Sequence, residues 1–183
     1  MTQRRIYQNE YPYFVTFRTR EGLALFEEAK YAELLAKIIL NAGRLKRYDI
    51  LSFQIMLDHV HMLVYKQCID SIGHNTDRTL EKVRSVGRAK RIHHPERTLS
   101  RVRDQDKKEC TISDLMQSIK GNFSLHMGNV WQRRFYTRIV DNDDYLRAVI
   151  EYIKQNPIRD GLPEKYHEMP YQCIDKNLLK LLL

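Results

Sequence analysis

The stretch Asp58-His59-Val60-His61-Met62-Leu63-Val64-Tyr65 decides the fold around which the rest of the chain is arranged. Its apolar and β-branched residues are typical of a β-strand, and Phe53-Gln54-Ile55-Met56 before it has the same character. Because side chains two residues apart share a face of a strand, we expect His59 and His61 to point the same way. Two neighbouring imidazoles on a rigid strand form half of a divalent-metal site, although two polar residues on a solvated sheet face would show the same pattern.

The composition is that of a basic chain of 183 residues, which is enough for a single domain with a sizeable core. The formal net charge of +8 and the pI near 9.4 favour a polyanionic partner such as DNA or RNA. Cys68, Cys110 and Cys173 are far apart and form no C-x-x-C pair, so a reduced compartment suits the chain. The sequence shows no signal peptide and no apolar stretch long enough to span a bilayer. We therefore expect a cytoplasmic, nucleoid-associated protein with no membrane contact.

Apolar periodicity and turn signals predict the order of helices and strands. The predicted strands span 13–19, 48–56, 59–66 and 135–140, and the predicted helices span 27–47, 111–128 and 142–156. Thr111 and Asp114 have the spacing of a helix N-terminus, and Pro157 is expected to end the last long helix because a residue before proline disfavours helical geometry. The leucine-rich end after Asp175 is either a docked helix or an oligomer contact.

Residues 68–110 interrupt this order and carry much of the positive charge. Between Arg78 and Arg103 there are nine Lys or Arg residues against two Glu residues, while Gly87 and Pro95 interrupt any helix. A solvated loop would not need charge of one sign, so we favour a phosphate-binding arm inserted into the domain. The histidines and cysteines near this segment lack the spacing of zinc-finger ligands, so a zinc site is not predicted.

The helix predicted at 142–156 carries a tyrosine on its flank. At about 100° per residue, Tyr152 lies about 110° from the centre of the apolar stripe, and Asn156 lies about 40° round from Tyr152 and one turn on. A phenol and an amide would thus project together, although a half-buried structural tyrosine is the ordinary alternative. Tyr145 lies on the same flank and competes with Tyr152.

Three motifs in this order resemble those of the single-tyrosine HUH transposases, especially the REP-associated tyrosine transposases. They are His59-Val60-His61 after two strands, Trp131-Gln132-Arg133-Arg134-Phe135-Tyr136 before a strand, and Tyr152-Ile153-Lys154-Gln155-Asn156-Pro157 on the last long helix. The resemblance runs from residue 4 to about residue 162 and leaves out 68–110. It implies an α/β (α+β) fold, with a ferredoxin-like antiparallel sheet and helices of the HUH-nuclease type, in one domain over 1–183.

The resemblance also implies a site and a reaction. His59, His61 and Asn156 would bind Mg²⁺ or Mn²⁺, and Tyr152 would be the nucleophile that forms a 5′-phosphotyrosine. The residues expected to contact DNA are Arg4, Arg5, Lys120, Arg133, Arg134 and Lys154. The partner would be single-stranded or hairpin DNA, and a homodimer is possible on this resemblance. The product would be nicked DNA that the enzyme rejoins to another strand.

Two alternatives have different consequences. A rolling-circle replication initiator or a relaxase would share the histidine pair, but the motif order and the short chain disfavour it. A catalytically silent protein derived from a transposase would bind DNA hairpins through the basic segments and cut nothing. Because such a protein has no reason to keep His59, His61 and Tyr152 together, we favour the enzyme.

Overall fold

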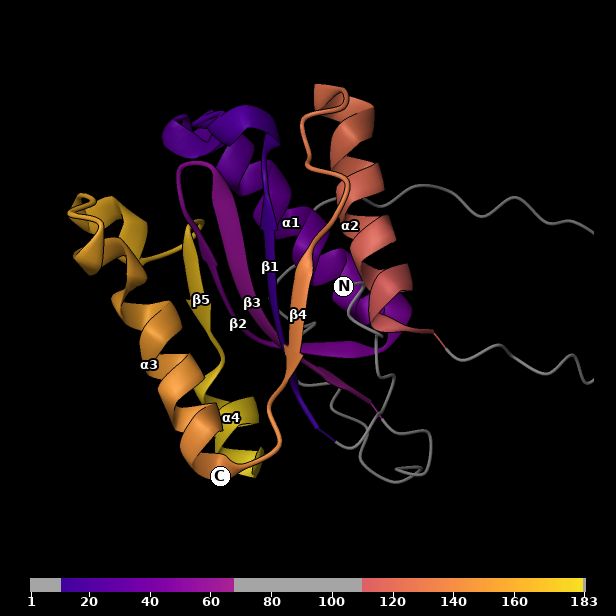
Figure 1. Cartoon of the computed structure of the whole chain (residues 1–183), viewed down its shortest axis with the longest axis vertical. Helices are drawn as coiled ribbons and strands as arrows, with labels where there is room; N and C mark the ends of the chain where they lie inside the picture. The colour runs from indigo at the N-terminus through magenta and orange to yellow at the C-terminus, as the bar shows by residue number, and fades with distance from the viewer. Residues whose placement is uncertain (1–10, 68–109, 183) are drawn as a thin grey trace, which may run out of the picture. The chain divides into compact units, whose positions relative to one another are not determined.

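A five-stranded antiparallel sheet is the centre of the computed structural model, which describes residues 11–67 and 110–182 (Figure 1). The strand order is β4-β1-β3-β2-β5. The strands are β1 Tyr13–Arg18, β2 Tyr48–Ile55, β3 His59–Lys66, β4 Tyr136–Ile139 and β5 Gln172–Ile174. With a helix after β1 and another after β3, the first four strands have the order of a ferredoxin-like fold. That prediction is confirmed, whereas β5 was not predicted.

The helices cover the two faces of the sheet in pairs (Figure 1). They are α1 Ala29–Lys46, α2 Ile112–Met127, α3 Asp143–Arg159 and α4 Lys176–Leu182, with short 3₁₀ turns at Arg20–Gly22, Leu25–Glu27 and Glu164–His167. Apolar residues of α1 and α2 belong to one buried cluster, and those of α3 and α4 to a second. Within the described ranges, no helix is both long and apolar enough to cross a membrane.

The alternation of β3 assigns its side chains to these two clusters. Val60, Met62 and Val64 are fully buried in the cluster beneath α1 and α2. Leu63 lies in the cluster beneath α3 and α4. Since His61 is two residues before Leu63, the strand turns the histidines toward the face that α3 covers.

The helix termini follow the sequence signals with one exception. Thr111 and Asp114 form the expected capping box at the start of α2, and the Asn142 side chain accepts a hydrogen bond from the Tyr145 amide at the start of α3. The predicted end of α3 before Pro157 is wrong, because the helix continues to Arg159. Asn156 and Pro157 are both buried, and the Asp160 amide bonds to the Asn156 carbonyl. Packing at this end therefore overrides the local preference of a residue before proline.

The leucine-rich end of the chain is a docked helix. Leu179 in α4 is buried in the cluster that also contains Leu146 and Val149 of α3. This agrees with the first of the two predicted roles for the segment, while dimer formation stays a prediction. The predicted insertion lies outside the described residues apart from Cys110, whose carbonyl accepts a hydrogen bond from the Lys66 ammonium group at 2.8 Å.

Candidate active site

Three adjacent strands bring polar side chains to the sheet face beneath α3. In the register of β1 and β3, Thr16 is opposite His61 and Arg18 is opposite His59. In the register of β2 and β3, Gln54 is opposite His61 on the other side. The histidine pair therefore lies in the middle of the sheet, flanked on both sides by strands that hold it in place.

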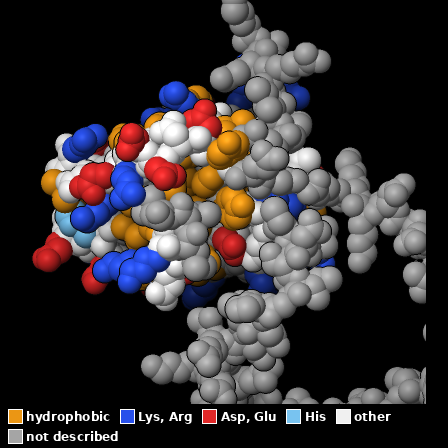
Figure 2. All heavy atoms as spheres, turned by 90° about the horizontal axis from the view of Figure 1, so that it is seen from below, with side chains coloured by type: hydrophobic (Ala, Val, Ile, Leu, Met, Phe, Trp, Pro, Cys, Tyr) orange, Lys and Arg blue, Asp and Glu red, His pale blue; other side chains and the backbone are white. Residues whose placement is uncertain are grey.

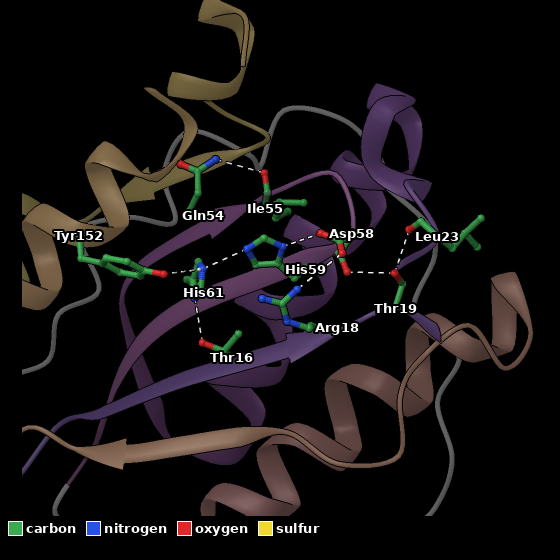
Figure 3. Close-up of polar contacts among 10 residues, drawn as sticks. All are labelled: Thr16, Arg18, Thr19, Leu23, Gln54, Ile55, Asp58, His59, His61 and Tyr152. Carbon is green, nitrogen blue, oxygen red and sulfur yellow. Dashed lines mark hydrogen bonds and ion pairs between the residues drawn. The ribbon is translucent and has the colours of Figure 1, made fainter. Parts of the chain in front are cut away.

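The two imidazoles are oriented by partners on their Nδ1 atoms (Figure 3). His59 Nδ1 is 2.6 Å from Asp58 Oδ1, and His61 Nδ1 is 2.8 Å from Thr16 Oγ1. A carboxylate only accepts, so His59 donates a hydrogen bond from Nδ1 to Asp58, and in this tautomer of the imidazole the Nε2 atom is the one that can bind a metal. The Thr16 hydroxyl can likewise accept a hydrogen bond from His61 Nδ1, which leaves the Nε2 lone pair of His61 available. Such partners fix the orientation of metal-binding histidines in other proteins.

The Nε2 atoms of His59 and His61 face one another at 3.1 Å. Burial and the neighbouring His59 lower the pKa of His61 to about 3, so its imidazole is neutral at physiological pH. Two ligand atoms about 2.1 Å from one cation, at a right angle, are about 3.0 Å apart. The spacing of the Nε2 atoms therefore fits two adjacent ligands of a single divalent ion.

Tyr152 projects from α3 toward this pair (Figure 3). Its hydroxyl oxygen is 3.4 Å from His61 Nε2, and the two rings are edge-to-face with centroids 5.1 Å apart. The edge of the ring also contacts Phe14 of β1. Tyr152 is nevertheless 38% exposed as a residue, so it lies at the surface beside the histidines, where a substrate can reach it. Tyr145 lies about two turns earlier, under the guanidinium group of Arg138.

Asn156 follows Tyr152 by one helical turn and is buried. Its Nδ2 atom has no hydrogen-bond partner among the described residues, which is unusual for a buried amide. No cluster of three His, Cys, Asp or Glu residues that could hold a metal occurs in the described part of the chain. The atom of Asn156 that lacks a partner is the amide nitrogen, which donates hydrogen bonds and does not bind cations, so its role as a metal ligand through Oδ1 stays a prediction.

Comparison with solved structures places this architecture among known folds. The structure of a REP-associated tyrosine transposase bound to a REP hairpin matches with a TM-score of 0.62 and 18% identity, over 100% of this chain and 88% of that one. The chain has the fold of that transposase. A protein from Deinococcus radiodurans R1, assigned by name to the transposases, matches with a TM-score of 0.43 and 16% identity, over 88% of this chain and 98% of that one. No family model and no curated protein matches.

Two arginines that the sequence analysis missed lie beside the site of this transposase-like fold. Arg18 Nη1 is 3.7 Å from Asp58 Oδ2, and about half of its side chain is exposed. The Arg159 guanidinium is 5.9 Å from the centre of the Tyr152 ring. Arg159 is three residues beyond the predicted end of α3 at residue 156 and two turns after Tyr152, so it shares the tyrosine's flank only because the helix passes through Pro157.

The predicted DNA-binding residues have different environments. Arg133 and Arg134 are exposed just before β4, whereas the Lys120 ammonium group donates to the main-chain carbonyls of Gln132 and Arg133. Lys154 is exposed and lies 3.9 Å from Glu151. Residues 4 and 5 are outside the described ranges. Lys120 therefore holds the loop before β4, and DNA binding by the exposed arginines of that loop stays a prediction.

The surface charge in the described part is mixed. Figure 2 shows Lys and Arg side chains interspersed with Asp and Glu on the face seen from below, with apolar side chains between them. Since charges of opposite sign close together cancel at long range, this face does not form a broad basic surface.

Proposed function

We propose that the protein is a metal-dependent DNA transposase that nicks single-stranded DNA beside a hairpin and rejoins strands through a 5′-phosphotyrosine at Tyr152. The observation that carries this proposal is the hydroxyl of Tyr152 at 3.4 Å from Nε2 of His61, with Nε2 of His59 a further 3.1 Å away. A surface-accessible phenol beside two imidazoles of fixed orientation is an arrangement suited to phosphoryl transfer. A structural tyrosine would need no such neighbours.

In this proposal His59, His61 and Asn156 hold Mg²⁺ or Mn²⁺. Imidazole and oxygen ligands suit these ions when water and phosphate oxygens complete the coordination. The ion supplies stabilisation of the negative charge that develops on the phosphate oxygens. The protein contributes the fixed orientation of the imidazoles, through Asp58 and Thr16.

The covalent step exchanges one phosphodiester for another. The Tyr152 oxygen forms a bond to phosphorus as the bond from phosphorus to the 3′ oxygen breaks, and the departing oxygen takes a proton to become a free 3′-hydroxyl. The phenolic proton leaves to solvent. Because the phosphotyrosine preserves the energy of the broken bond, a 3′-hydroxyl of another strand can displace Tyr152 without ATP. The exposed guanidinium groups of Arg18, beside Asp58, and of Arg159, beside the Tyr152 ring, would bind phosphates of the DNA strand.

The proposed substrate is a hairpin with single-stranded flanks. A duplex would hide the scissile phosphate and its bases from a tyrosine on a helix, whereas an unpaired strand can lie across the sheet face. The structural neighbour with a TM-score of 0.62 was solved with a REP hairpin, which supports the same class of ligand for this chain. Arg133 and Arg134, exposed before β4, are suited to the phosphates of such a strand.

A labelled-hairpin assay tests the proposal. Hairpins from palindromic repeats of the source genome, with single-stranded flanks and Mn²⁺, should yield a covalent protein–DNA species when labelled at the 3′ end. With a 5′ label they should yield a shorter free fragment. Tyr152→Phe should abolish both products and keep hairpin binding, while Tyr145→Phe, the matched control on the same helix, should cleave normally. EDTA should prevent cleavage by the unmodified protein.

Two results would contradict the proposal. A normal adduct with Tyr152→Phe would move the nucleophile elsewhere. The unmodified protein could instead bind the hairpin tightly and form no covalent species with any divalent metal. That result would indicate the catalytically silent hairpin-binding protein.

A further inference from the structure

A cleft lies between α2 and the segment that leads into β4, apart from the residues assigned to catalysis. Its volume is about 420 Å³, within the range of small-molecule sites. Its lining includes the amides of Gln117, Asn129 and Gln132, the aromatic ring of Phe135, and the cations Lys120 and Arg133. Among the described residues, no Asp or Glu lines it. Its chemistry therefore suits a ligand with hydrogen-bonding edges, an aromatic face and negative charge.

One wall of the cleft is a glycine in the middle of a helix. Gly121 lies well inside α2, where glycine costs about 1 kcal/mol of helix stability relative to alanine. A Cβ atom built on Gly121 would meet nothing within 4 Å, and the backbone there is ordinary helix. Neither close packing nor an unusual backbone angle therefore requires this glycine. What the missing side chain provides is open space in the cleft.

The opposite wall of the cleft, the segment before β4, is hydrogen-bonded to the end of β1, the strand that pairs with the histidine strand β3. The Lys120 ammonium group donates to the main-chain carbonyls of Gln132 and Arg133. The backbone N–H of Gln132 donates to the Arg18 carbonyl at 2.9 Å. Arg20 Nε bonds to the Trp131 carbonyl at 3.2 Å. Because Arg18 is the β1 residue opposite His59, the cleft and the candidate active site are attached to the same end of one strand.

We propose that this cleft binds one unpaired nucleotide of the DNA strand, and the proposal rests on the function proposed above. The primary amides suit the hydrogen-bonding edge of a base, and Phe135 offers a ring for its face. Arg133 is exposed and suits the attached phosphate. The cleft would fix the flank of the hairpin at a second point and so set which phosphate reaches Tyr152.

Trp131 can report on this cleft, because it is the one tryptophan of the chain and its buried ring forms part of the cleft wall. The probe is a hairpin oligonucleotide with single-stranded flanks, titrated into the full chain in EDTA so that no cleavage occurs. We expect saturable quenching of Trp131 fluorescence. Gly121→Phe, which fills the cleft, should weaken hairpin binding about 10-fold and remove the quenching. Leu125→Phe adds a ring at an exposed position of α2 outside the cleft and should bind normally.

Abasic substitutions in the flank identify the nucleotide. Removing one base at a time should weaken binding by the unmodified protein about 10-fold at one position, and Gly121→Phe should show no further loss at that position. Melting curves check that the variant folds, and Gly121→Leu repeats the blockage with a better helix former. The cleft proposal is wrong if both filled variants bind the hairpin, show quenching of Trp131 and lose affinity at the abasic position as the unmodified protein does. The same result is expected if a protein partner or another part of this chain occupies the cleft.

The outcomes separate the cleft from the function. A normal covalent adduct, together with filled variants that bind normally, would overturn the cleft proposal and keep the transposase. Hairpin binding that depends on Gly121, without any adduct, would overturn the transposase and keep a nucleotide-binding cleft.

Discussion

On one face of the sheet, α1 and α2 close an apolar core that includes Val60, Met62 and Val64 of β3. On the other face, α3 and α4 pack over a smaller apolar cluster, and the same strand contributes His59 and His61 beside it. These side chains of β3 are buried on both faces. Those named beneath α1 and α2 are all apolar. The other buries imidazoles whose nitrogens are each bonded or directed at one another.

The difference shows how a strand can serve stability and chemistry at once. Adjacent residues of β3 are separated by the sheet, so a change at one position is felt mainly on one face. Packing on the apolar face fixes the position of the β3 backbone. The histidines on the polar face are held in place by that backbone, although they contribute little packing themselves. Substitutions at neighbouring positions of β3 should therefore separate the two effects.

The largest effect is expected for His61→Ala on the polar face. It removes one imidazole and the hydrogen-bond partner of the Tyr152 hydroxyl, so formation of the covalent adduct should fall by about 10²–10³-fold. The rate is measured with 3′-labelled hairpin and Mn²⁺. His126→Ala, at an exposed histidine in α2, is the matched control and should react normally. A variant of His61 that reacts at the full rate would show that the histidine pair is structural.

Met62→Ala, one residue on, should have the converse effect. Met62 is fully buried in the core beneath α1 and α2, so its truncation leaves a cavity and should lower the free energy of unfolding by about 2–5 kcal/mol. Urea denaturation measures this loss. Well below the melting temperature, adduct formation per folded molecule should stay unchanged. If the rate falls as much as with His61→Ala, the two faces are not separable.

Asp58→Asn should have a smaller effect confined to the polar face. The amide can still accept the His59 Nδ1 proton but loses the charge that strengthens this bond and attracts Arg18. Such partners of metal-binding histidines contribute about 10- to 100-fold to metal affinity, so the Mn²⁺ concentration for half-maximal adduct formation should rise by that factor. Asp49→Asn is the control: it changes a carboxylate of β2 that accepts a hydrogen bond from Gln67, and it should leave the metal requirement unchanged.

The features that the sequence predicts here are local ones. The strand character around Val60 predicted β3 with its observed bounds, and its two-residue period predicted that the histidines share a face. The spacing of Thr111 and Asp114 predicted the start of α2. Helical geometry predicted that Tyr152 lies on a flank of α3, where the residue is 38% exposed. Each depends on backbone geometry within a few residues, which the chain encodes directly.

The features that it does not predict depend on which strands pair and in what register. Thr16 and Arg18 are more than forty residues from the histidines, and only the pairing of β1 with β3 brings them opposite. Arg159 reaches Tyr152 because α3 continues through Asn156 and Pro157, which are both buried. The preference of a residue before proline for non-helical geometry would end the helix there. Asp58 could have been recognised, since a carboxylate directly before a strand histidine can reach its Nδ1 atom.

The smallest expected effect compares two glycines in the helices α1 and α2, which cover the apolar side of the sheet. Gly43 in α1 would place a Cβ atom 2.7 Å from Ile50 Cγ1 and 2.9 Å from the Tyr48 carbonyl oxygen, so it allows the helix to approach β2. Gly121 in α2 has no such neighbour. Gly121→Ala should therefore raise the free energy of unfolding by about 0.5–1 kcal/mol in urea denaturation, whereas Gly43→Ala should lower it. A destabilising Gly121→Ala would mean that the glycine serves the packing of α2, and the open wall of the cleft would lose its explanation.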